Sequence, residues 1–544
     1  MNIQEKIKNW VKETLGTEVD FVLEHPSDLK NGDYSTNVAL TTKTPAKELV
    51  EKLEANRIKE VSKVEIAGPG FINFTLTPVA IATALREART QDMWGANTLQ
   101  TGRKIMVEYT DPNPFKEFHI GHLMSNATGE SISRLLQFSG AEIKRACYQG
   151  DVGPHVAKAI WGVQKLELDP SDAARLGQAY AAGAQAYESD AAAKVEIDGI
   201  NVRVYDKSDS SINNVYAKGR EASLRHFEDL YQILGTTFDF YFFESETAPK
   251  GVALVRAHPE IFEESEGAVV FRGEQYGLHT RVFINKLGLP TYEAKDLGLA
   301  ELKNEEVSLD QSITVTAQEQ TDYFRVVKKA MELVMPEIGS TVLHISHGMM
   351  RFADGKMSSR TGNVITGESL ITDLIEVAKT RATESRADDA DVLAEQIAVA
   401  AIKYQILKQG SGKDIIFDRE RALSLEGDSG PYLQYAYART CAILMKAREQ
   451  GVESTLDETI EPSELMRLLC RFPQVVEHAA AEYEPHLVAQ FLLQIASGFN
   501  SWYAQELILD GTLAAAHKVA IVVVVNRTLK NGLWILGIPA PEKM

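Results

Sequence analysis

The sequence has few cysteines and no long hydrophobic run, and both absences restrict what the protein can be. Cys147, Cys441 and Cys470 are its three cysteines and form no CxxC pair, which argues against a disulfide framework or a cysteine zinc site and favours a reducing compartment. The most apolar run, residues 519–525, is far shorter than the about 20 residues that a membrane-spanning helix needs. The first residues lack the basic region and apolar core of a signal peptide. We therefore expect a cytoplasmic protein without membrane attachment.

The sequence also has fewer basic residues than acidic residues. The 57 lysines and arginines stand against 76 acidic residues, and the net charge is −19. Nucleic-acid-binding proteins usually have a basic surface patch, so the negative net charge argues against a simple nucleic-acid-binding protein. It does not exclude such a partner, because steering depends on the local distribution of charge. The composition is otherwise that of a globular protein, and the length of 544 residues predicts roughly three to four domains.

The hydrophobic pattern divides the chain into parts. Residues 1 to about 95 are typical of an α+β unit, with helices at 2–15 and near 45–55 and strands near 64–66 and 71–74. From about residue 385 the chain is nearly all helical. The β-branched stretch 519–525 is ambiguous by propensity, but we expect a helix there that ends at a cap on Gly532.

Between these parts, strands and helices alternate, which favours a parallel, doubly wound sheet. We expect an Ala-rich helical insertion within this part and a region of short strands with glycine turns after it. The expected elements are a strand at 104–109, a helix at about 121–138, a strand at 142–147, the helical insertion at 155–235, short strands over 237–285, and further strands at 312–315 and 341–345.

Two histidines flank a glycine in FHIGH, residues 118–122, soon after the strand at 104–109. Nucleotides bind open α/β sheets beyond the carboxyl ends of the strands, near helix N-termini. Gly121 would let a nucleobase approach the backbone. His119 and His122 would donate hydrogen bonds to phosphate oxygens and stabilise the charge that develops at an α-phosphate. The alternative is a helix cap with two satisfied histidines.

A second polar segment, GKMSSR at residues 355–360, fits a flexible loop. Such a loop can close over a triphosphate, place the Lys356 cation on the leaving pyrophosphate and then open. The alternative is a solvated surface turn.

The two segments together resemble the HIGH and KMSKS elements of class I aminoacyl-tRNA synthetases. The resemblance implies that ATP is the nucleotide, that Mg²⁺ accompanies it, and that the protein has no metal site of its own. Ser359 departs from the pattern, which has a second lysine there, and Lys116 is our candidate for the missing charge. The ATP-binding residues implied are His119, Gly121, His122, Lys356, Met357 and Ser358, and the catalytic ones are His119, His122, Lys356 and Lys116.

Over nearly its whole length the sequence resembles the arginyl-tRNA synthetase family. The motifs that carry the resemblance are GPGFINF at 68–74, VEY at 107–109 with PNP at 112–114, PTYEAKD at 290–296, GPYLQYAYAR at 430–439 and LGIPAPEKM at 536–544. The resemblance implies an α/β multidomain protein that charges tRNA(Arg) with L-arginine. It would have an α+β N-terminal domain that contacts the tRNA elbow (1–98), a Rossmann-like catalytic domain (99–384, with an insertion at about 155–290) and an all-α anticodon-binding domain (385–544). We expect a monomer.

The resemblance also implies an arginine pocket. A guanidinium is a permanent cation with a planar fork of donors, so its pocket needs carboxylates and planar packing. Glu108, Asp296 and Tyr292 would contact the guanidinium, and Asn113 and Gln320 the α-amino end. For each acidic residue, the alternative is a surface charge or a salt-bridge partner.

Tyr432, Tyr435 and Arg439 are spaced three and four residues apart, so they share one face of a helix. Aromatic rings and an arginine plane suit unstacked bases, although an aromatic stripe is more often part of a core. The family resemblance favours anticodon binding, and it makes Phe71 and Asn73 candidate contacts with the tRNA elbow.

Two other functions remain open. A class I synthetase for cysteine or glutamine would share the two class motifs, but cysteine enzymes usually carry zinc ligands, and neither enzyme explains Tyr292 with Asp296. A catalytically silent paralogue that binds tRNA would explain Ser359, but not the retention of His119 and His122.

Overall fold

A five-stranded parallel sheet forms the centre of the molecule, in a computed structural model that describes residues 3–353, 365–382 and 389–544. The strand order is β12-β11-β5-β6-β7. The chain passes from β5 through β6 to β7 on one side and later adds β11 on the other side of β5. The order therefore reverses beside β5, where open α/β sheets bind their ligands. The strands are β5 Lys104–Glu108, β6 Glu142–Gln149, β7 Phe240–Phe243, β11 Gln311–Ala317 and β12 Val342–His347.

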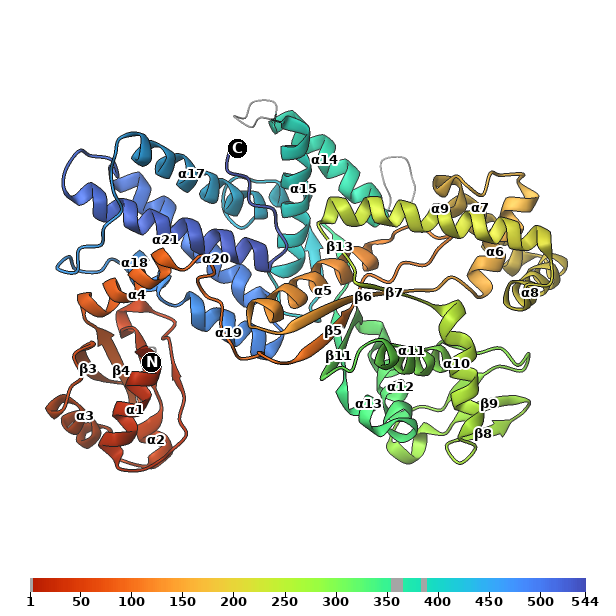
Figure 1. Cartoon of the computed structure of the whole chain (residues 1–544), viewed down its shortest axis with the longest axis horizontal. Coiled ribbons are helices and arrows are strands. Elements are labelled where there is room, and N and C mark those ends of the chain that lie inside the picture. The colour runs from red at the N-terminus through yellow and green to blue at the C-terminus, as the bar shows by residue number, and fades with distance from the viewer. Residues whose placement is uncertain (1–2, 354–364, 383–388) are drawn as a thin grey trace.

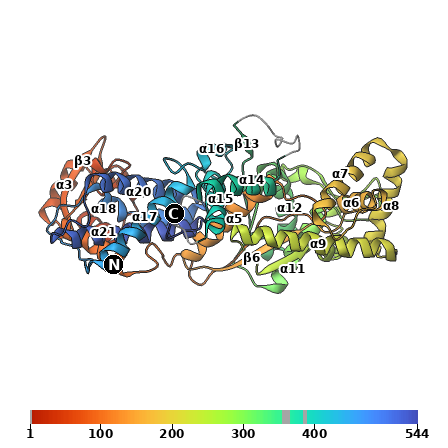
Figure 2. The same ribbon diagram turned by 90° about the horizontal axis from the view of Figure 1, so that it is seen from above.

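Helices connect these strands and cover the sheet (Figure 1). Four of them form the expected helical insertion between β6 and β7, at the end of the molecule opposite the N-terminal unit (Figure 2). The helices are α5 Ile120–Phe138, then the insertion helices α6 Pro154–Lys165, α7 Ala173–Ser189, α8 Ala191–Asp206 and α9 Ser210–Leu234, and later α11 Tyr292–Glu306, α12 Thr321–Val334, α13 Pro336–Thr341 and α14 Gly367–Ala382.

The region after β7 differs from the sequence-based expectation. Its short strands are present as an antiparallel sheet of order β10-β9-β8, with β8 Phe262–Ser265, β9 Ala268–Phe271 and β10 Arg281–Ile284. However, helix α10 Glu244–Ala257 precedes them and was not expected. It contains Pro249, a residue that normally interrupts helices, and it packs closely on α11, since a Cβ on Gly251 would come within 1.9 Å of the Ala294 carbonyl oxygen.

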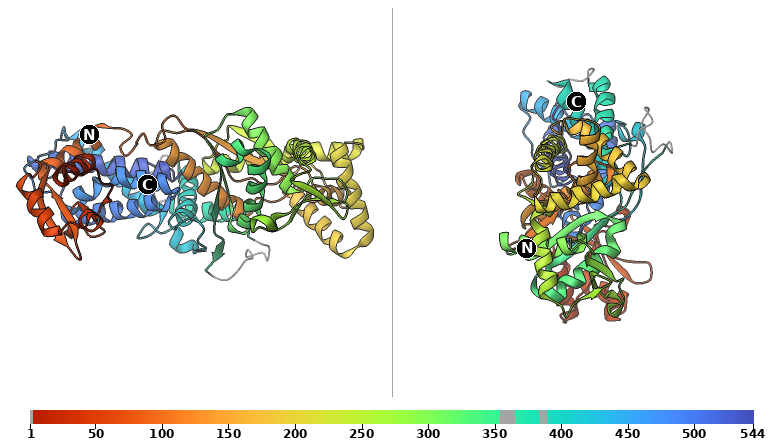
Figure 3. Two further views of the ribbon diagram at one scale, coloured as in Figure 1. Left: turned by 90° about the horizontal axis from the view of Figure 1, so that it is seen from below. Right: turned by 90° about the vertical axis from the view of Figure 1, so that its right-hand side faces the viewer.

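The N-terminal unit is an antiparallel sheet of order β1-β2-β4-β3 with helices packed against it. It lies beside the C-terminal helices at one end of the elongated molecule (Figure 3). Arg467 links the two, because its Nη1 atom donates to Asp33 at 2.5 Å. The elements are α1 Ile3–Leu15, β1 Leu23–Glu24, β2 Tyr34–Thr36, α2 Val38–Thr42, α3 Ala46–Ala55, β3 Val61–Ala67, β4 Phe71–Leu76 and α4 Pro78–Thr90.

The C-terminal part is a helical bundle, as expected. Its short strand β14 Ile415–Phe417 pairs in parallel with β13 Met350–Phe352, which precedes this part in the chain. Residues 519–525 lie within a helix, but the expected end at Gly532 is wrong, because the helix continues to Ile535. Gly532 allows close packing instead, since a Cβ there would come within 2.4 Å of Leu492. The helices are α15 Ala390–Leu407, α16 Arg419–Ala422, α17 Gly430–Glu449, α18 Glu464–Leu469, α19 Phe472–Glu482, α20 His486–Gln505 and α21 Ala514–Ile535.

Candidate active site

The loop between β5 and α5 lies at the switch point of the sheet. Glu108 is the last residue of β5 and pairs with Thr314 of β11. The loop then turns through left-handed conformations at Thr110, Asp111 and Phe115, with φ values of 81°, 48° and 68°. Residues other than glycine adopt such conformations only at an energetic cost, and these conformations cluster at functional sites. The loop leads directly into the N-terminus of α5.

His119 and His122 form a stacked pair at the start of α5. Their ring centroids are 3.4 Å apart. Nδ1 of His119 accepts the backbone N–H of His122 at 3.3 Å, and Nδ1 of His122 accepts that of His119 at 3.2 Å. Because Nδ1 is the acceptor in each ring, each neutral imidazole carries its proton on Nε2. Both histidines therefore cap the helix and keep an Nε2–H donor.

The charge state of this pair follows from its surroundings. Burial, the His119 ring and the Lys116 cation lower the pKa of His122 well below its ordinary value. Desolvation and Lys116 also lower the pKa of His119, so both rings are neutral donors at pH 7.

Gly121 has a local reason to be glycine, since a Cβ there would come within 3.0 Å of the His119 ring. Lys116 Nζ lies 5.0 Å from the ring centroid of Tyr180, on the insertion helix α7.

Three acidic side chains lie beside the end of β5. Glu108 Oε2 is 2.6 Å from Lys303 Nζ, and both side chains are buried. Asp296, on α11, accepts a hydrogen bond of 2.6 Å from the Tyr323 hydroxyl. A cavity of about 40 Å³ is lined by Glu108, Asp296 and Lys303 together with mostly apolar side chains. Burial and Glu108 raise the pKa of Asp111 well above its ordinary value.

A fourth carboxylate, Glu244, follows β7 and forms a buried ion pair with Lys295 at 2.5 Å. Burial raises the pKa of Glu244 against the opposing effect of Lys295. Glu244 converges with Asn113 over Gly150, where a Cβ would come within 2.2 Å of Asn113 Oδ1 and 3.1 Å of Glu244 Oε1. Sequence reasoning missed Glu244, although it stands at the carboxyl end of a parallel strand, where site residues gather.

The remaining candidates of the arginine pocket are more exposed. Tyr292, the first residue of α11, is 56 % exposed, and Lys295 Nζ lies 5.2 Å from its ring centroid. Gln320 is exposed and lies beyond the end of β11, in a short 3₁₀ turn. The structure therefore brings Glu108, Asp296, Asn113 and Tyr292 to one region and leaves Gln320 at its edge. The predicted loop residues Lys356, Met357, Ser358 and Ser359 lie outside the described residues.

The predicted anticodon residues lie together on α17. The guanidinium of Arg439 donates to Asn500 Oδ1 at 2.6 Å and to the Tyr435 hydroxyl at 3.0 Å. It lies 4.7 Å from the ring centroid of Tyr435 and 5.1 Å from that of Tyr503, and Asn500 donates to the Tyr432 hydroxyl at 3.0 Å. Asn500 and Tyr503, on α20, are members of this cluster that the sequence pattern of α17 could not indicate.

The two predicted contacts in the N-terminal unit differ in exposure. Phe71 and Asn73 both belong to β4, one of the two inner strands of the N-terminal sheet. Phe71 is half-buried, whereas Asn73 is only 8 % exposed. Phe71 is therefore the better placed of the two to contact a partner.

Comparisons with known proteins agree with this architecture. Family models match three segments: the arginyl tRNA synthetase N-terminal domain at residues 1–76, the class I (R) tRNA synthetase catalytic domain at 84–419 and the DALR anticodon binding domain at 433–544. The arginine–tRNA ligase of Clostridium perfringens is 30 % identical, over 100 % of this chain and 99 % of its own length.

The chain belongs to the arginyl-tRNA synthetase family. The arginine–tRNA ligase of Pediococcus pentosaceus is also 30 % identical, over 97 % of this chain and 96 % of its own length. The fold matches that of arginyl-tRNA synthetase from Thermus thermophilus, with a TM-score of 0.79 at 24 % identity and full coverage of both chains. The Plasmodium falciparum enzyme gives 0.77 at 21 % identity, covering 100 % of this chain and 99 % of that one. The expected fold class, with its class I catalytic domain between an N-terminal and a helical domain, is confirmed.

Membership of the arginyl-tRNA synthetase family implies the use of ATP. Among the residues that the structure describes, no group of three or more histidine, cysteine, aspartate or glutamate side chains is arranged to bind a metal ion. Within the same described ranges, no helix has the length and apolarity to cross a membrane.

Proposed function

We propose that this chain is an arginine–tRNA ligase that activates L-arginine with ATP and transfers it to the 3′-terminal adenosine of tRNA(Arg). The observation that supports it best is the cluster of three carboxylates at the ends of the central strands and on α11: Glu108 and Glu244, which are buried, and Asp296, which is half-buried. Such a cluster suits a permanent cation with several donors. The neutral histidine pair lies next to it, at a helix N-terminus that suits a phosphate.

The chemistry has two steps. The arginine carboxylate attacks the α-phosphorus of ATP, and the bond to pyrophosphate breaks to leave arginyl-adenylate. A hydroxyl of the terminal adenosine then attacks the arginyl carbonyl carbon, and AMP leaves. Nε2–H of His119 and of His122 would donate to the phosphate oxygens as negative charge grows. Lys116, close enough to lower the pKa of both rings, would add a cation, and Lys356 would contact the departing pyrophosphate.

In the proposed arginine pocket, each acidic side chain would have a different role. Asp296 would contact the guanidinium, and the ring of Tyr292 would pack on its plane. Glu108 already shares its Oε2 atom with Lys303, so arginine would bind its other oxygen. Glu244 and Asn113, which converge over Gly150, would contact the α-amino end, with Gln320 at the margin.

The affinity for arginine is expected to rise as the pH rises through about 8. Burial, with the carboxylates of Glu108 and Glu244, raises the pKa of Asp296 to about 8. A guanidinium binds the ionised carboxylate, so the neutral form present below this pH has to lose its proton first. KM for arginine, measured by tRNA charging from pH 6.5 to pH 9 (roughly one to two units around this pKa), should fall over this range. If KM for arginine fell in the same way in the Asp296→Asn variant, the titrating group would be another residue.

The Arg439 cluster would bind an anticodon base. Its guanidinium lies over the rings of Tyr435 and Tyr503, so the planar groups are preorganised before tRNA arrives. A base could stack on this cluster, while the amide of Asn500 could form hydrogen bonds with its edge.

Removing Arg439 is expected to weaken tRNA binding selectively. Because stacking contributes about 1–3 kcal/mol per base, Arg439→Ala should raise KM for tRNA about tenfold, with KM for arginine unchanged. The matched control is Arg448→Ala, an exposed arginine in the last turn of the same helix. Equal KM values for tRNA in the two variants would refute an anticodon contact at Arg439.

The remaining assignments also belong to this proposal. The domains would comprise residues 1–98, 99–384 and 385–544, with the insertion at about 155–290. Phe71 of the first domain would contact the tRNA elbow, with Asn73 beside it. Mg²⁺ would accompany ATP, and the protein would act as a monomer in the cytoplasm, where charged tRNA is consumed. Sedimentation of the full chain would test the monomer.

A further inference from the structure

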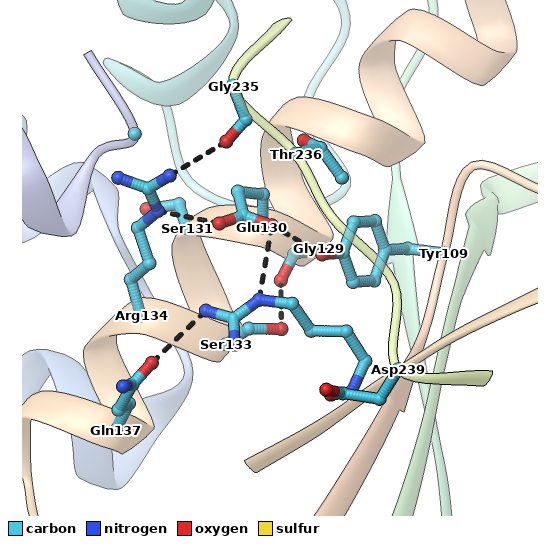
Figure 4. Close-up of polar contacts among 12 residues, drawn as sticks. Tyr109, Gly129, Glu130, Ser131, Ser133, Arg134, Gln137, Gly235, Thr236 and Asp239 are labelled. Atoms are coloured by element: carbon cyan, nitrogen blue, oxygen red, sulfur yellow. Dashed lines mark hydrogen bonds and ion pairs between the residues drawn. The ribbon is translucent and has the colours of Figure 1, made fainter. Parts of the chain in front are cut away.

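A buried carboxylate lies behind the arginine site, in the middle of α5. Glu130 is 2 % exposed and is surrounded by cations and a tyrosine (Figure 4). Its Oε1 atom accepts from Arg134 Nε at 2.6 Å, and its Oε2 atom lies 3.3 Å from Arg145 Nε and accepts a short hydrogen bond from the Tyr109 hydroxyl. Although burial opposes ionisation, Arg134, Arg145 and Lys403 lower the pKa of Glu130. Glu130 is therefore ionised at neutral pH.

Tyr109 connects Glu130 to the loop that bears the site. It follows Glu108 in the chain, so the two side chains point to opposite faces of the sheet. The ring of Tyr109 packs against α5, where a Cβ on Gly129 would come within 2.3 Å of it. The next residue, Thr110, donates its N–H to Ser125 Oγ at 3.0 Å. Helix α5 thus fixes the backbone on the C-terminal side of Glu108.

The cations around Glu130 also contact the end of the chain. Arg134 Nη1 donates to the Trp534 carbonyl oxygen at 3.2 Å, and its guanidinium lies 5.4 Å from the Trp534 ring centroid. Lys403, fully buried on α15, donates to the Gly537 carbonyl oxygen at 2.9 Å. The C-terminal segment, residues 534–537, is therefore bound by Arg134 and Lys403, two of the three basic side chains around Glu130, and burial lowers the pKa of Lys403 to about 7.

A second backbone segment meets the same two cations. Arg134 Nη2 donates to the Gly235 carbonyl oxygen at 2.9 Å, and Lys403 Nζ donates to that of Leu234 at 2.6 Å. These residues end the insertion helix α9. The half-buried Arg134 and the buried Lys403 thus each have defined hydrogen-bond partners, as burial of polar groups requires. The cluster joins α5, the insertion and the C-terminal segment at one place.

We propose that Glu130 is a positioning residue for arginine binding, which orients Glu108 through Tyr109, and that the C-terminal segment keeps Glu130 in place through Arg134 and Lys403. The inference rests on the proposed function. Glu130 does not touch the substrate. When the backbone is already anchored, arginine binding does not have to supply the free energy needed to order the loop. Loosening the anchor therefore weakens arginine binding. ATP, which the proposed function places at the N-terminus of α5, does not depend on this anchor and is spared.

Three variants and one control test this inference in the full-length enzyme. Tyr109→Phe removes one hydroxyl and keeps the ring, Glu130→Gln removes the charge, and Lys403→Met removes the contact with the C-terminal segment. The control, Lys408→Met, makes the same change just after the same helix, where Lys408 forms an ion pair with Asp428 at 2.8 Å. KM for arginine and KM for ATP are measured separately by tRNA charging, beside the melting temperature.

Tyr109→Phe is expected to raise KM for arginine about tenfold, the effect of losing a hydrogen bond to a charged group, without a change in KM for ATP. Lys403→Met should shift KM for arginine in the same direction, and the Glu130→Gln/Lys403→Met double variant should show less than the sum of the two effects, because the residues act through one cluster. Lys408→Met should match the wild type.

Two results would overturn the proposal. One is an unchanged KM for arginine in Tyr109→Phe, and the other is a parallel rise for arginine and ATP, which would mean that the cluster merely stabilises α5. Tyr109→Phe decides the question even if Glu130→Gln does not fold, because it leaves the charges in place. A wild-type protein that charges no tRNA with arginine would instead refute the proposed function.

Discussion

Asp296→Asn is expected to lower kcat/KM for arginine about a hundredfold or more, because it removes the carboxylate that would pair with the guanidinium. Asparagine keeps the volume of the side chain and an oxygen that can accept the hydrogen bond from Tyr323, observed at 2.6 Å in the wild type. The fold should therefore remain intact, and the loss should be confined to arginine. Charging kinetics with arginine and ATP varied in turn would measure it, and KM for ATP should stay at the wild-type value.

The control for this variant is Asp322→Asn. Asp322 is an exposed acid in the first turn of α12, and it forms a surface ion pair with Arg325 at 3.5 Å. Surface pairs of this kind contribute little, so the control should retain wild-type kinetics. If both variants charged tRNA equally well, Asp296 would not belong to the arginine pocket.

His119→Asn is expected to lower kcat about a hundredfold or more, as the loss of one donor to a developing charge does elsewhere. His119 has two tasks, since its Nδ1 caps α5 at 3.3 Å and its Nε2–H would stabilise the transition state. Asparagine is among the best N-cap residues, so this variant keeps the cap and removes the imidazole. The loss in kcat should therefore report on chemistry rather than on the helix.

Rapid-quench measurement of adenylate formation, in the presence of tRNA, would place the His119 effect in the first step. The matched control is His258→Asn, which changes a histidine at the end of α10 that pairs with Glu260 at 2.9 Å. A wild-type rate in His119→Asn would mean that the pair only caps the helix, the alternative that the sequence alone left open.

Local patterns predicted the framework of the site. Because nucleotide sites occupy strand-to-helix turns, FHIGH after the strand at residues 104–108 placed His119 and His122 at the start of α5, where the structure has them. Family motifs predicted that Glu108, Asn113, Tyr292 and Asp296 lie in one pocket, and the structure brings these four residues to one region. Their predicted roles remain proposals that the variants described above test.

The pairings within the site could not be predicted, because they join residues far apart in the chain. Glu108 meets Lys303 and Glu244 meets Lys295 only when α11 packs beside the sheet. Helix α10 was missed because Pro249 interrupts its pattern. Gly532 indicated a helix end, whereas it allows tight packing on Leu492. In each case tertiary packing overrode a local rule.

The most direct measurement is the transfer of radiolabelled amino acids to tRNA(Arg), with and without ATP, across arginine and a panel of the other amino acids. The account predicts ATP-dependent charging with arginine alone, abolished in Asp296→Ala. Binding of tRNA without charging by any amino acid would contradict it and would identify a catalytically silent paralogue instead.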